Sequence, residues 1–321
     1  MLFISLLGGA WKESSGELVE EYWLVAYAPH GVTGVETYEI GLSRFSDVDW
    51  NEFRSWYSVG DKLDIPETVY ITDDDNGNNA LSPPESCDWR LAGLVYEPRD
   101  QKQLLTPQYR NNVELAIVSY NVGSCNASYA FAVMHATEIQ YAIHKLKLLY
   151  LSVQQFIDCT HNYGNNGCHG GDTLSLLKYL QTMGLETEEM YPYTGGDQEC
   201  MANSSNVTVR SIGYKSIQNG SESDLRDVIC SEGPYVVTMN IDENFLHYKS
   251  GIYQSIYCNE SNLNQSMAVI GYDSNEGIDY WILKNSWGTN WGEDGFVYVR
   301  RNYENMCGIA SFAFAPVFNF L

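Results

Sequence analysis

The pattern of apolar and polar positions divides the chain into a helical part and a later, strand-rich part. Apolar side chains recur at roughly helical spacing over 126–147 and predict a long helix, whose N-cap is Asn126 or a neighbour. Its apolar face consists of Ala130, Phe131, Met134, Ile139 and Ile143. Three shorter helices are predicted from a capping-box start at Ser152, over 173–183 and over 223–228.

After Pro234 the sequence changes to short runs of β-branched and aromatic residues, which predict strands. These runs are 235–240, 267–272, 280–284 and 295–300. Because helices come first and strands later, the order of elements indicates an α+β fold in which a helical lobe faces a β lobe.

The composition limits the class of protein. The 321 residues, 44% of them hydrophobic, suffice for one large core or two smaller ones. The net charge of −23 argues against nucleic acid or an anionic membrane surface as a partner, and no stretch reaches the ~20 apolar residues of a membrane-spanning helix. Residues 1–10 resemble a short signal peptide cleaved after Ala10, but they contain no basic residue. A signal peptide and a trimmed or mis-started N-terminus therefore stay as two alternatives.

The cysteines favour an oxidising compartment, because there are eight and their spacing is clustered. Six Asn-x-Ser/Thr sequons give modest support to a secretory route, so the chain is expected to be a secreted or lysosomal glycoprotein. The sequons begin at Asn126, Asn203, Asn206, Asn219, Asn259 and Asn264. No closely spaced pair of cysteines or histidines is present, so neither a metal site nor another cofactor is expected.

Three segments carry the chemistry. Segment 123–132 reads GSCNASYAFA, segment 263–267 reads LNQSM and segment 284–288 reads KNSWG. In this order they resemble the papain family of cysteine peptidases, and its cathepsin L-like members in particular. The resemblance implies a two-lobed fold, with a substrate cleft between a helical lobe and a β-barrel-like lobe.

The resemblance also implies a role for each catalytic position. Ser128 stands where the family has its cysteine nucleophile, Gln265 where it has the histidine base, and Asn285 where it has the asparagine that orients that histidine. A serine hydroxyl needs a base at the moment of attack, and a glutamine amide accepts no proton between pH 5 and 8. Loss of nucleophile and base together costs on the order of 10⁶ in turnover in an analogous triad.

Two residues are candidates for the oxyanion-binding position. The family has a glutamine just before Gly-Ser-Cys, whereas Val122 occupies that place here. Gln101 is the alternative if the 21 residues 102–122 loop out and return. This insertion is read either as a genuine loop or as an error of sequence assembly. Loss of such a donor costs roughly 10² to 10³ in turnover.

The substrate-binding residues implied by the resemblance are partly kept. Gly170 and Gly171 match the glycine pair that lets an extended peptide approach the backbone. Asn126 replaces a glycine of the first specificity pocket and should narrow it, and Trp287 belongs to the same cleft. A glycan on Asn126 or Asn264 would obstruct the cleft.

Three disulfide bridges are implied by the resemblance. They are Cys125–Cys168, Cys159–Cys200 and Cys258–Cys307. Cys87 and Cys230 are left over, either as a fourth bridge or as two buried thiols.

The N-terminal part resembles the end of a papain-type propeptide, on the pattern Gly41, Phe45 and Asp47. The long helix that precedes this pattern in the family is not found, because Pro29 and two glycines interrupt the segment. We therefore expect a truncated propeptide over 11–80 and a peptidase domain over 81–321.

Three functions are weighed. The first is a pseudopeptidase, monomeric, that binds a peptide or protein in the cleft. The second is a hydrolase that uses Ser128 with an unrecognised base, and His247 is a candidate for that base. A hydrolase with Cys125 as nucleophile is a further alternative. The third is a structural or templating protein similar to the silicateins, which also carry serine before Tyr-Ala-Phe but keep the histidine.

Overall fold

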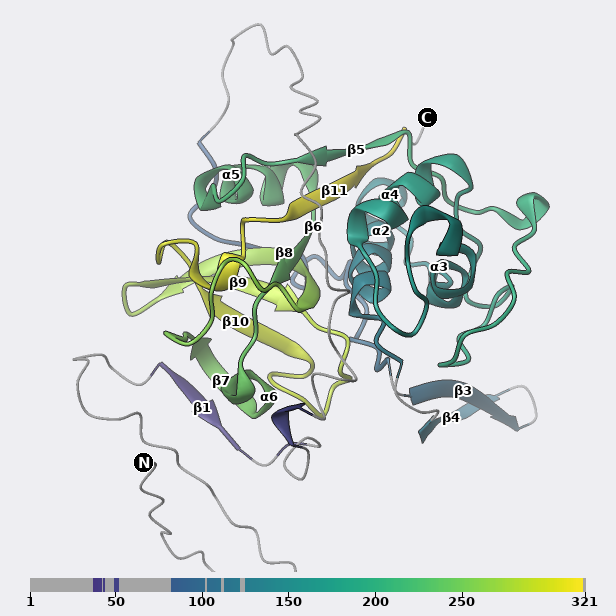
Figure 1. The fold of residues 1–321 in the computed structure, drawn as a ribbon, viewed down its shortest axis with the longest axis horizontal. Helices are drawn as coiled ribbons and strands as arrows, with labels where there is room; N and C mark the ends of the chain where they lie inside the picture. Colours follow the sequence, from purple (N-terminus) through teal and green to yellow (C-terminus); the bar gives the residue numbers. More distant parts are fainter. Residues whose placement is uncertain are drawn as a thin grey trace, which may run out of the picture.

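The structure, a computed structural model, describes residues 37–41, 43, 49–51, 82–101, 103–110, 113–121 and 125–319. The expected signal peptide 1–10, most of the propeptide region 11–80 and Val122 lie outside these ranges. Two lobes lie side by side in Figure 1, one built mainly of helices and one mainly of strands. The predicted α+β fold with a helical lobe and a β lobe is therefore confirmed.

Three helices form the helical lobe around a shared apolar core that contains Phe131, Phe156 and Leu177. They are α2 (Ser128–Lys145), α3 (Val153–Cys159) and α4 (Thr173–Thr182), accompanied by the short 3-10 helices η1 (His161–Tyr163) and η2 (Ser204–Asn206). The predicted helices of this lobe are thus present, with ends that differ by a few residues.

Local capping explains where these helices begin. Ser152 accepts a hydrogen bond from the backbone of Gln155, as the capping box predicts, and Asp172 caps α4. The N-cap of α2 is Ala127, the neighbour of Asn126, and it offers no side-chain hydrogen bond. The first turn of α2 therefore lacks a side-chain cap, which leaves its backbone N–H groups available to other partners.

The β lobe is a nine-stranded sheet in the order β1-β7-β10-β9-β8-β6-β11-β5, with β2 beside β8. Its strands are β1 (Tyr38–Ile40), β2 (Cys87–Asp88), β5 (Gly213–Ser216), β6 (Tyr235–Met239), β7 (Tyr248–Tyr253), β8 (Gln265–Asn275), β9 (Ile278–Lys284), β10 (Phe296–Arg300) and β11 (Ala313–Val317). Neighbouring strands are antiparallel except β7 and β10. Helices α5 (Glu222–Glu232), α6 (Glu243–Leu246) and η3 (Met306–Gly308) belong to this half of the chain. The four predicted strands correspond to β6, β8, β9 and β10.

The two lobes meet where α2 packs against β8. Ile139 of α2 shares an apolar cluster with Ala268 and Ile270 of β8 and with Ile282 of β9. This packing fixes the long helix against the sheet, and so brings the start of α2 toward the start of β8.

The insertion forms a separate two-stranded sheet. Strand β3 (Gln103–Arg110) pairs antiparallel with β4 (Val113–Asn121), and among the described residues these strands pair only with each other. In Figure 1 this hairpin lies beyond the helical lobe. The described residues of the insertion therefore form a pair of antiparallel strands, called the β3–β4 hairpin below.

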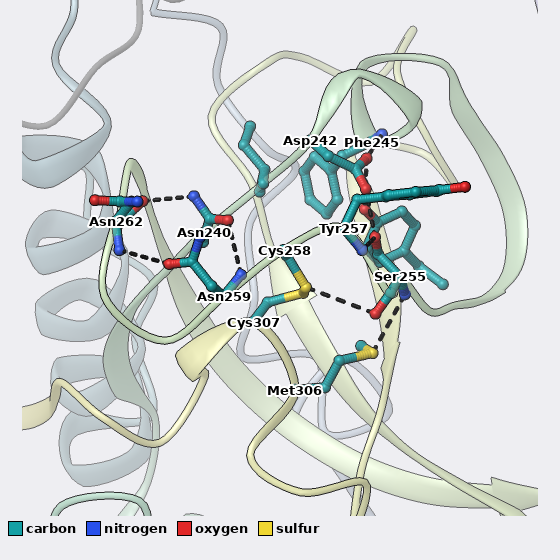
Figure 2. The surroundings of a disulfide bond; sticks show 12 residues. Asn240, Asp242, Phe245, Ser255, Tyr257, Cys258, Asn259, Asn262, Met306 and Cys307 are labelled. Carbon is teal, nitrogen blue, oxygen red and sulfur yellow. Dashed lines mark hydrogen bonds between the residues drawn. A yellow bond between two sulfur atoms is a disulfide. The ribbon is translucent and has the colours of Figure 1, made fainter.

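All eight cysteines are paired. Cys125–Cys168 and Cys159–Cys200 hold the helical lobe, and Cys258–Cys307 holds the β lobe (Figure 2). The fourth bridge, Cys87–Cys230, joins β2 to α5, so the two left-over cysteines are not free thiols.

The described part of the N-terminal region is attached to the β lobe. Strand β1 pairs antiparallel with β7, and the Tyr38 ring lies 5.1 Å from the Tyr253 ring. The N–H of Gly41 donates to the carbonyl of His247 at 2.9 Å, and the Ser43 hydroxyl donates to the carbonyl of Leu246 at 3.0 Å. In the part of the chain that the structure describes, no helix is long and apolar enough to cross a membrane.

Candidate active site

Ser128 is the first residue of α2 and lies at the junction of the two lobes. Its hydroxyl oxygen accepts a hydrogen bond from the backbone N–H of Ser266 at 3.4 Å, and its side chain is buried. Because Ser266 follows Gln265 at the start of β8, this contact brings two of the sequence-predicted catalytic positions together across the lobe junction.

Gln265 is joined to Asn285 by a hydrogen bond between two side-chain amides. The Nε2 of Gln265 donates to the Oδ1 of Asn285 at 2.8 Å, and the backbone N–H of Ser286 donates to the same oxygen at 2.9 Å. The second bond requires an oxygen at that position of Asn285, which in turn requires Gln265 to present its nitrogen there.

In this orientation two buried polar atoms, the Oε1 of Gln265 and the Nδ2 of Asn285, have no hydrogen-bond partner among the residues that the structure describes. Both residues are fully buried. An unsatisfied buried polar group costs about 1–3 kcal/mol. Position 265 therefore carries an amide that does not titrate, where the family resemblance implies an imidazole. Asn285 is hydrogen-bonded to this amide instead of to an imidazole.

The Ser128 hydroxyl has no imidazole partner among the described residues. His135 follows on the same helix, and seven residues at 1.5 Å each place it about 10 Å further along the axis. His169 lies 3.5 Å from Asp197 and is largely exposed, while His247 follows α6. Cys125 is in a disulfide and has no thiol to act as nucleophile.

Gln101 lies beside the start of α2, although 23 residues separate it from Cys125 in the chain. Its Nε2 donates to the carbonyl of Cys125 at 3.1 Å, and its Oε1 accepts from the Ser286 hydroxyl at 2.8 Å. Its backbone N–H donates to the carbonyl of Ser286 at 3.0 Å, and the Tyr193 hydroxyl donates to its carbonyl. The chain thus returns after the β3–β4 hairpin to a point next to where it left, and Gln101 is the described candidate for the oxyanion position.

The glycine pair lies on the helical-lobe side. Gly170 has φ of +97°, a left-handed conformation that favours glycine, and a Cβ on Gly171 would lie 2.5 Å from the Tyr129 ring. The N–H of Asn126 donates to the carbonyl of Cys168 at 2.9 Å, and Asn126 forms a parallel β-bridge with His169. Asn126 and the glycine pair are therefore neighbours.

Trp287 is fully buried in the β lobe. It makes edge contacts with Phe245 and Trp291, at ring-centroid distances of 5.7 and 4.8 Å. These contacts hold the chain just after Asn285 and Ser286, so Trp287 supports the amide pair through packing.

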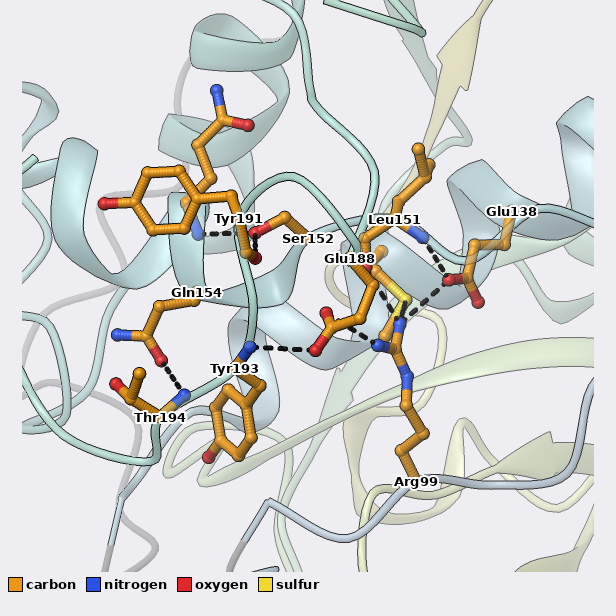
Figure 3. A network of polar contacts seen from close by, with 11 residues as sticks. Arg99, Glu138, Leu151, Ser152, Gln154, Glu188, Tyr191, Tyr193 and Thr194 are labelled. Atoms are coloured by element: carbon orange, nitrogen blue, oxygen red, sulfur yellow. Dashed lines mark hydrogen bonds and ion pairs between the residues drawn. The ribbon is translucent and has the colours of Figure 1, made fainter. Parts of the chain in front are cut away.

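An ionic cluster around Arg99, in which Glu138 is buried and Arg99 and Glu188 are partly buried, was not predicted from the sequence (Figure 3). The Arg99 guanidinium donates to Glu138 of α2 at 2.8 Å, to Glu188 at 3.2 Å and to the carbonyl of Leu151 at 3.2 Å. The carboxylate of Glu138 also accepts the N–H of Leu151 at 2.8 Å, and Glu188 accepts the N–H of Tyr193 at 2.8 Å. A glutamate in the middle of the apolar helix 128–145 was the sequence signal for this cluster.

Lys284 and His135 are buried close to the same cluster. Burial lowers the pKa of Lys284 to about 7, against an opposing effect of Glu138. Burial, together with the charges of Lys284 and Arg99, also lowers the pKa of His135, so its imidazole is neutral at pH 7. Burial raises the pKa of Glu138, an effect that Arg99 and Lys284 oppose.

The depressed pKa of Lys284 predicts how stability depends on pH. Between pH 7 and 9 the unfolded chain keeps the Lys284 proton while the folded chain loses it, so stability rises with pH. We expect Lys284→Met to remove up to about 1.4 kcal/mol of this rise per pH unit. Thermal unfolding of both proteins at pH 7, 8 and 9 measures it. Parallel stability curves for the natural chain and the variant would contradict the prediction.

Together, the two-lobed fold and the buried polar residues at the junction of the lobes define a papain-like protein. A family model described as papain family cysteine protease matches residues 109–317, and the chain belongs to this family.

Relatives and solved structures agree with this assignment. The chain is 35% identical over 284 residues to a cathepsin L-like proteinase of Fasciola hepatica, covering 88% of this chain and 80% of the relative. It is 31% identical to cathepsin L of Sarcophaga peregrina, covering 88% and 79%. Digestive procathepsin L 3 of Tenebrio molitor larval midgut superposes with a TM-score of 0.74 at 33% identity, covering 88% of this chain and 83% of that one. The chain is thus cathepsin L-like, and its similarity extends to precursor forms.

Proposed function

We propose that this papain-family chain is a pseudopeptidase, which binds a peptide or protein segment in its cleft and does not cleave it. The observation that carries the proposal is the amide pair: Gln265 donates to Asn285 at 2.8 Å, next to a serine that has no described imidazole partner. Neither amide takes a proton at pH 5–8, so no group at this position activates the Ser128 hydroxyl or protonates a leaving amine.

The binding side of the site supports retention of a ligand. Gly170 and Gly171 offer backbone without side chains, as needed for an extended peptide to pair with the chain. Gln101 places a side-chain amide beside the start of α2, where its Nε2 donates a hydrogen bond to the backbone carbonyl of Cys125. Ligand binding of this kind depends on hydrogen bonds and shape rather than on a reactive group. We also propose that the protein is secreted or lysosomal, and that it meets its ligand there. Its disulfides and its cathepsin relatives support this location.

The experiment is a comparison of the natural chain with Ser128→Ala. Both are expected to show the same background rate of peptide hydrolysis, and an electrophilic serine probe is expected to leave Ser128 unlabelled. The measurements are release of a fluorescent leaving group from peptide substrates and mass spectrometry of the probe-treated protein. A rate that Ser128→Ala abolishes would instead establish the alternative, a hydrolase with Ser128 as nucleophile.

Binding is tested separately with a synthetic mixture of capped octapeptides passed over the immobilised natural chain. We expect a subset to be retained uncleaved, and the same subset to be recovered from Ser128→Ala, because the hydroxyl does no chemistry. Asn126→Gly is expected to widen the retained subset toward bulkier side chains. Failure to retain any peptide would contradict the binding part of the proposal while leaving the inactivity untouched.

A further inference from the structure

The six sequons differ in whether the nitrogen that would carry a glycan is accessible. An N-linked oligosaccharide is attached to the asparagine side-chain nitrogen, so that atom must be exposed and have open space around it. The structure describes all six asparagines, and they fall into two groups of three.

Three of the asparagines are closed to modification. Asn264 uses both atoms of its amide on one residue: Oδ1 accepts from the N–H of Ile241 at 2.7 Å and Nδ2 donates to its carbonyl at 3.1 Å. The Nδ2 of Asn206 donates to the carboxylate of Glu186 at 3.1 Å. Asn126 is only 4% exposed. A glycan on Asn206 or Asn264 would disturb a hydrogen bond of the side-chain amide, and a glycan on Asn126 would have to fit where the side chain is buried.

The other three asparagines are exposed, and among the described residues their Nδ2 atoms make no hydrogen bond. Asn203 turns its Oδ1 to the N–H of Ser205 at 3.0 Å, which leaves Nδ2 toward solvent. Asn219 lies at the tip of a turn that is closed by a 3.0 Å hydrogen bond from the N–H of Ser221 to the carbonyl of Gln218.

Asn259 has the most defined geometry (Figure 2). Its Oδ1 accepts from the N–H and the hydroxyl of Ser261, at 2.9 and 3.0 Å, and from the N–H of Asn262 at 3.0 Å. The hydroxyl of the sequon thus already contacts the amide of the acceptor asparagine. The backbone of Asn259 is held by Asn240 at 3.0 Å and by the adjoining Cys258–Cys307 bridge, so the turn is preformed.

We propose that Asn203, Asn219 and Asn259 carry N-linked oligosaccharides and that Asn126, Asn206 and Asn264 do not. In the reaction the Nδ2 of the asparagine bonds to C1 of the first sugar of a lipid-pyrophosphate-linked oligosaccharide. The bond from C1 to the pyrophosphate oxygen breaks, the lipid pyrophosphate leaves with the electron pair, and one amide proton passes to solvent. The four disulfides are consistent with folding in the compartment where this donor is found.

The experiment expresses the full chain in eukaryotic cells with a secretory leader and treats the purified protein with an amidase that removes N-glycans. In heavy-oxygen water each occupied asparagine becomes a labelled aspartate, which peptide mass spectrometry locates. An incubation without amidase controls for Asn219, because an asparagine that precedes glycine also deamidates on its own. We expect labels at the three open asparagines and none at the three closed ones.

Substitutions that keep the backbone hydrogen bonds of these turns give a second measurement. Ser205→Ala, Asn219→Gln and Ser261→Ala should each remove one step of electrophoretic mobility. Ser221→Ala is avoided, because the Ser221 hydroxyl caps α5 by accepting from the N–H of Asp224 at 3.1 Å. The triple variant should migrate with the amidase-treated natural chain. A label at Asn126, Asn206 or Asn264, or a missing label at any open asparagine, overturns the assignment at that position.

Discussion

The double variant Ser128→Cys, Gln265→His is expected to hydrolyse peptides about 10³-fold faster than the natural chain. The Oδ1 of Asn285 already accepts a hydrogen bond from position 265 at 2.8 Å, so it is placed to orient an imidazole. A cysteine at the start of α2 would lie at a helix N-terminus, where a thiolate is favoured. Initial rates with a fluorogenic peptide measure the gain.

Each single substitution is expected to stay near the natural background. A thiol without its base and a base without its thiol both lack the ion pair on which attack depends. The matched control is Ser128→Ala, Gln265→His, which keeps the imidazole and removes any nucleophile. If the double variant is folded but stays at background, the two side chains are not all that the site lacks. Asn126 and the β3–β4 hairpin would then be the next residues to change.

Arg99→Met is expected to destabilise the protein by about 3–5 kcal/mol. The substitution leaves the carboxylates of Glu138 and Glu188 without the guanidinium that lies 2.8 and 3.2 Å from them. Glu138 is fully buried, and burial already raises its pKa, so it cannot be hydrated in place of the lost partner. Urea unfolding followed by tryptophan fluorescence measures the change in free energy.

A matched arginine separates this effect from the loss of any arginine. Arg210 is exposed and donates to the carbonyl of Met183 at 3.0 Å, so Arg210→Met should change stability by less than about 0.5 kcal/mol. Arg99→Lys should lie between the two, because lysine keeps the charge but lacks the planar fork of donors. Equal losses of stability from Arg99→Met and Arg210→Met would contradict a stabilising role of the Arg99 cluster.

Much of the fold could be predicted because its signals are local. The capping serine at Ser152 and the β-branched runs after Pro234 each act within a few residues, and α3, β6, β8 and β9 form where they predict. The β3–β4 hairpin was not predicted, because segment 102–122 was interpreted only as a loop or an assembly error. Its run over 113–121 is rich in residues that favour strands.

The candidate site, like the fold, was predictable only where its signals are local. The order of the three motifs was enough to propose Ser128, Gln265 and Asn285 as site residues. The orientation of the two amides depends on the N–H of Ser286, which only the folded structure reveals. Only Glu138, a carboxylate within the apolar stretch of α2, pointed to the Arg99 cluster, because its other members come from distant segments that meet only in the folded chain. Charge and apolar pattern along the chain do not encode such a meeting.

The amide pair also has a consequence for how the protein responds to acidification. An imidazole at position 265 would gain a proton as the surrounding fluid moved from neutral to the acidity of a digestive vesicle. The glutamine keeps the same uncharged form throughout that change, as does its asparagine neighbour. The charge of the amide pair is therefore the same in both environments, and any sensitivity to acid must arise elsewhere in the molecule.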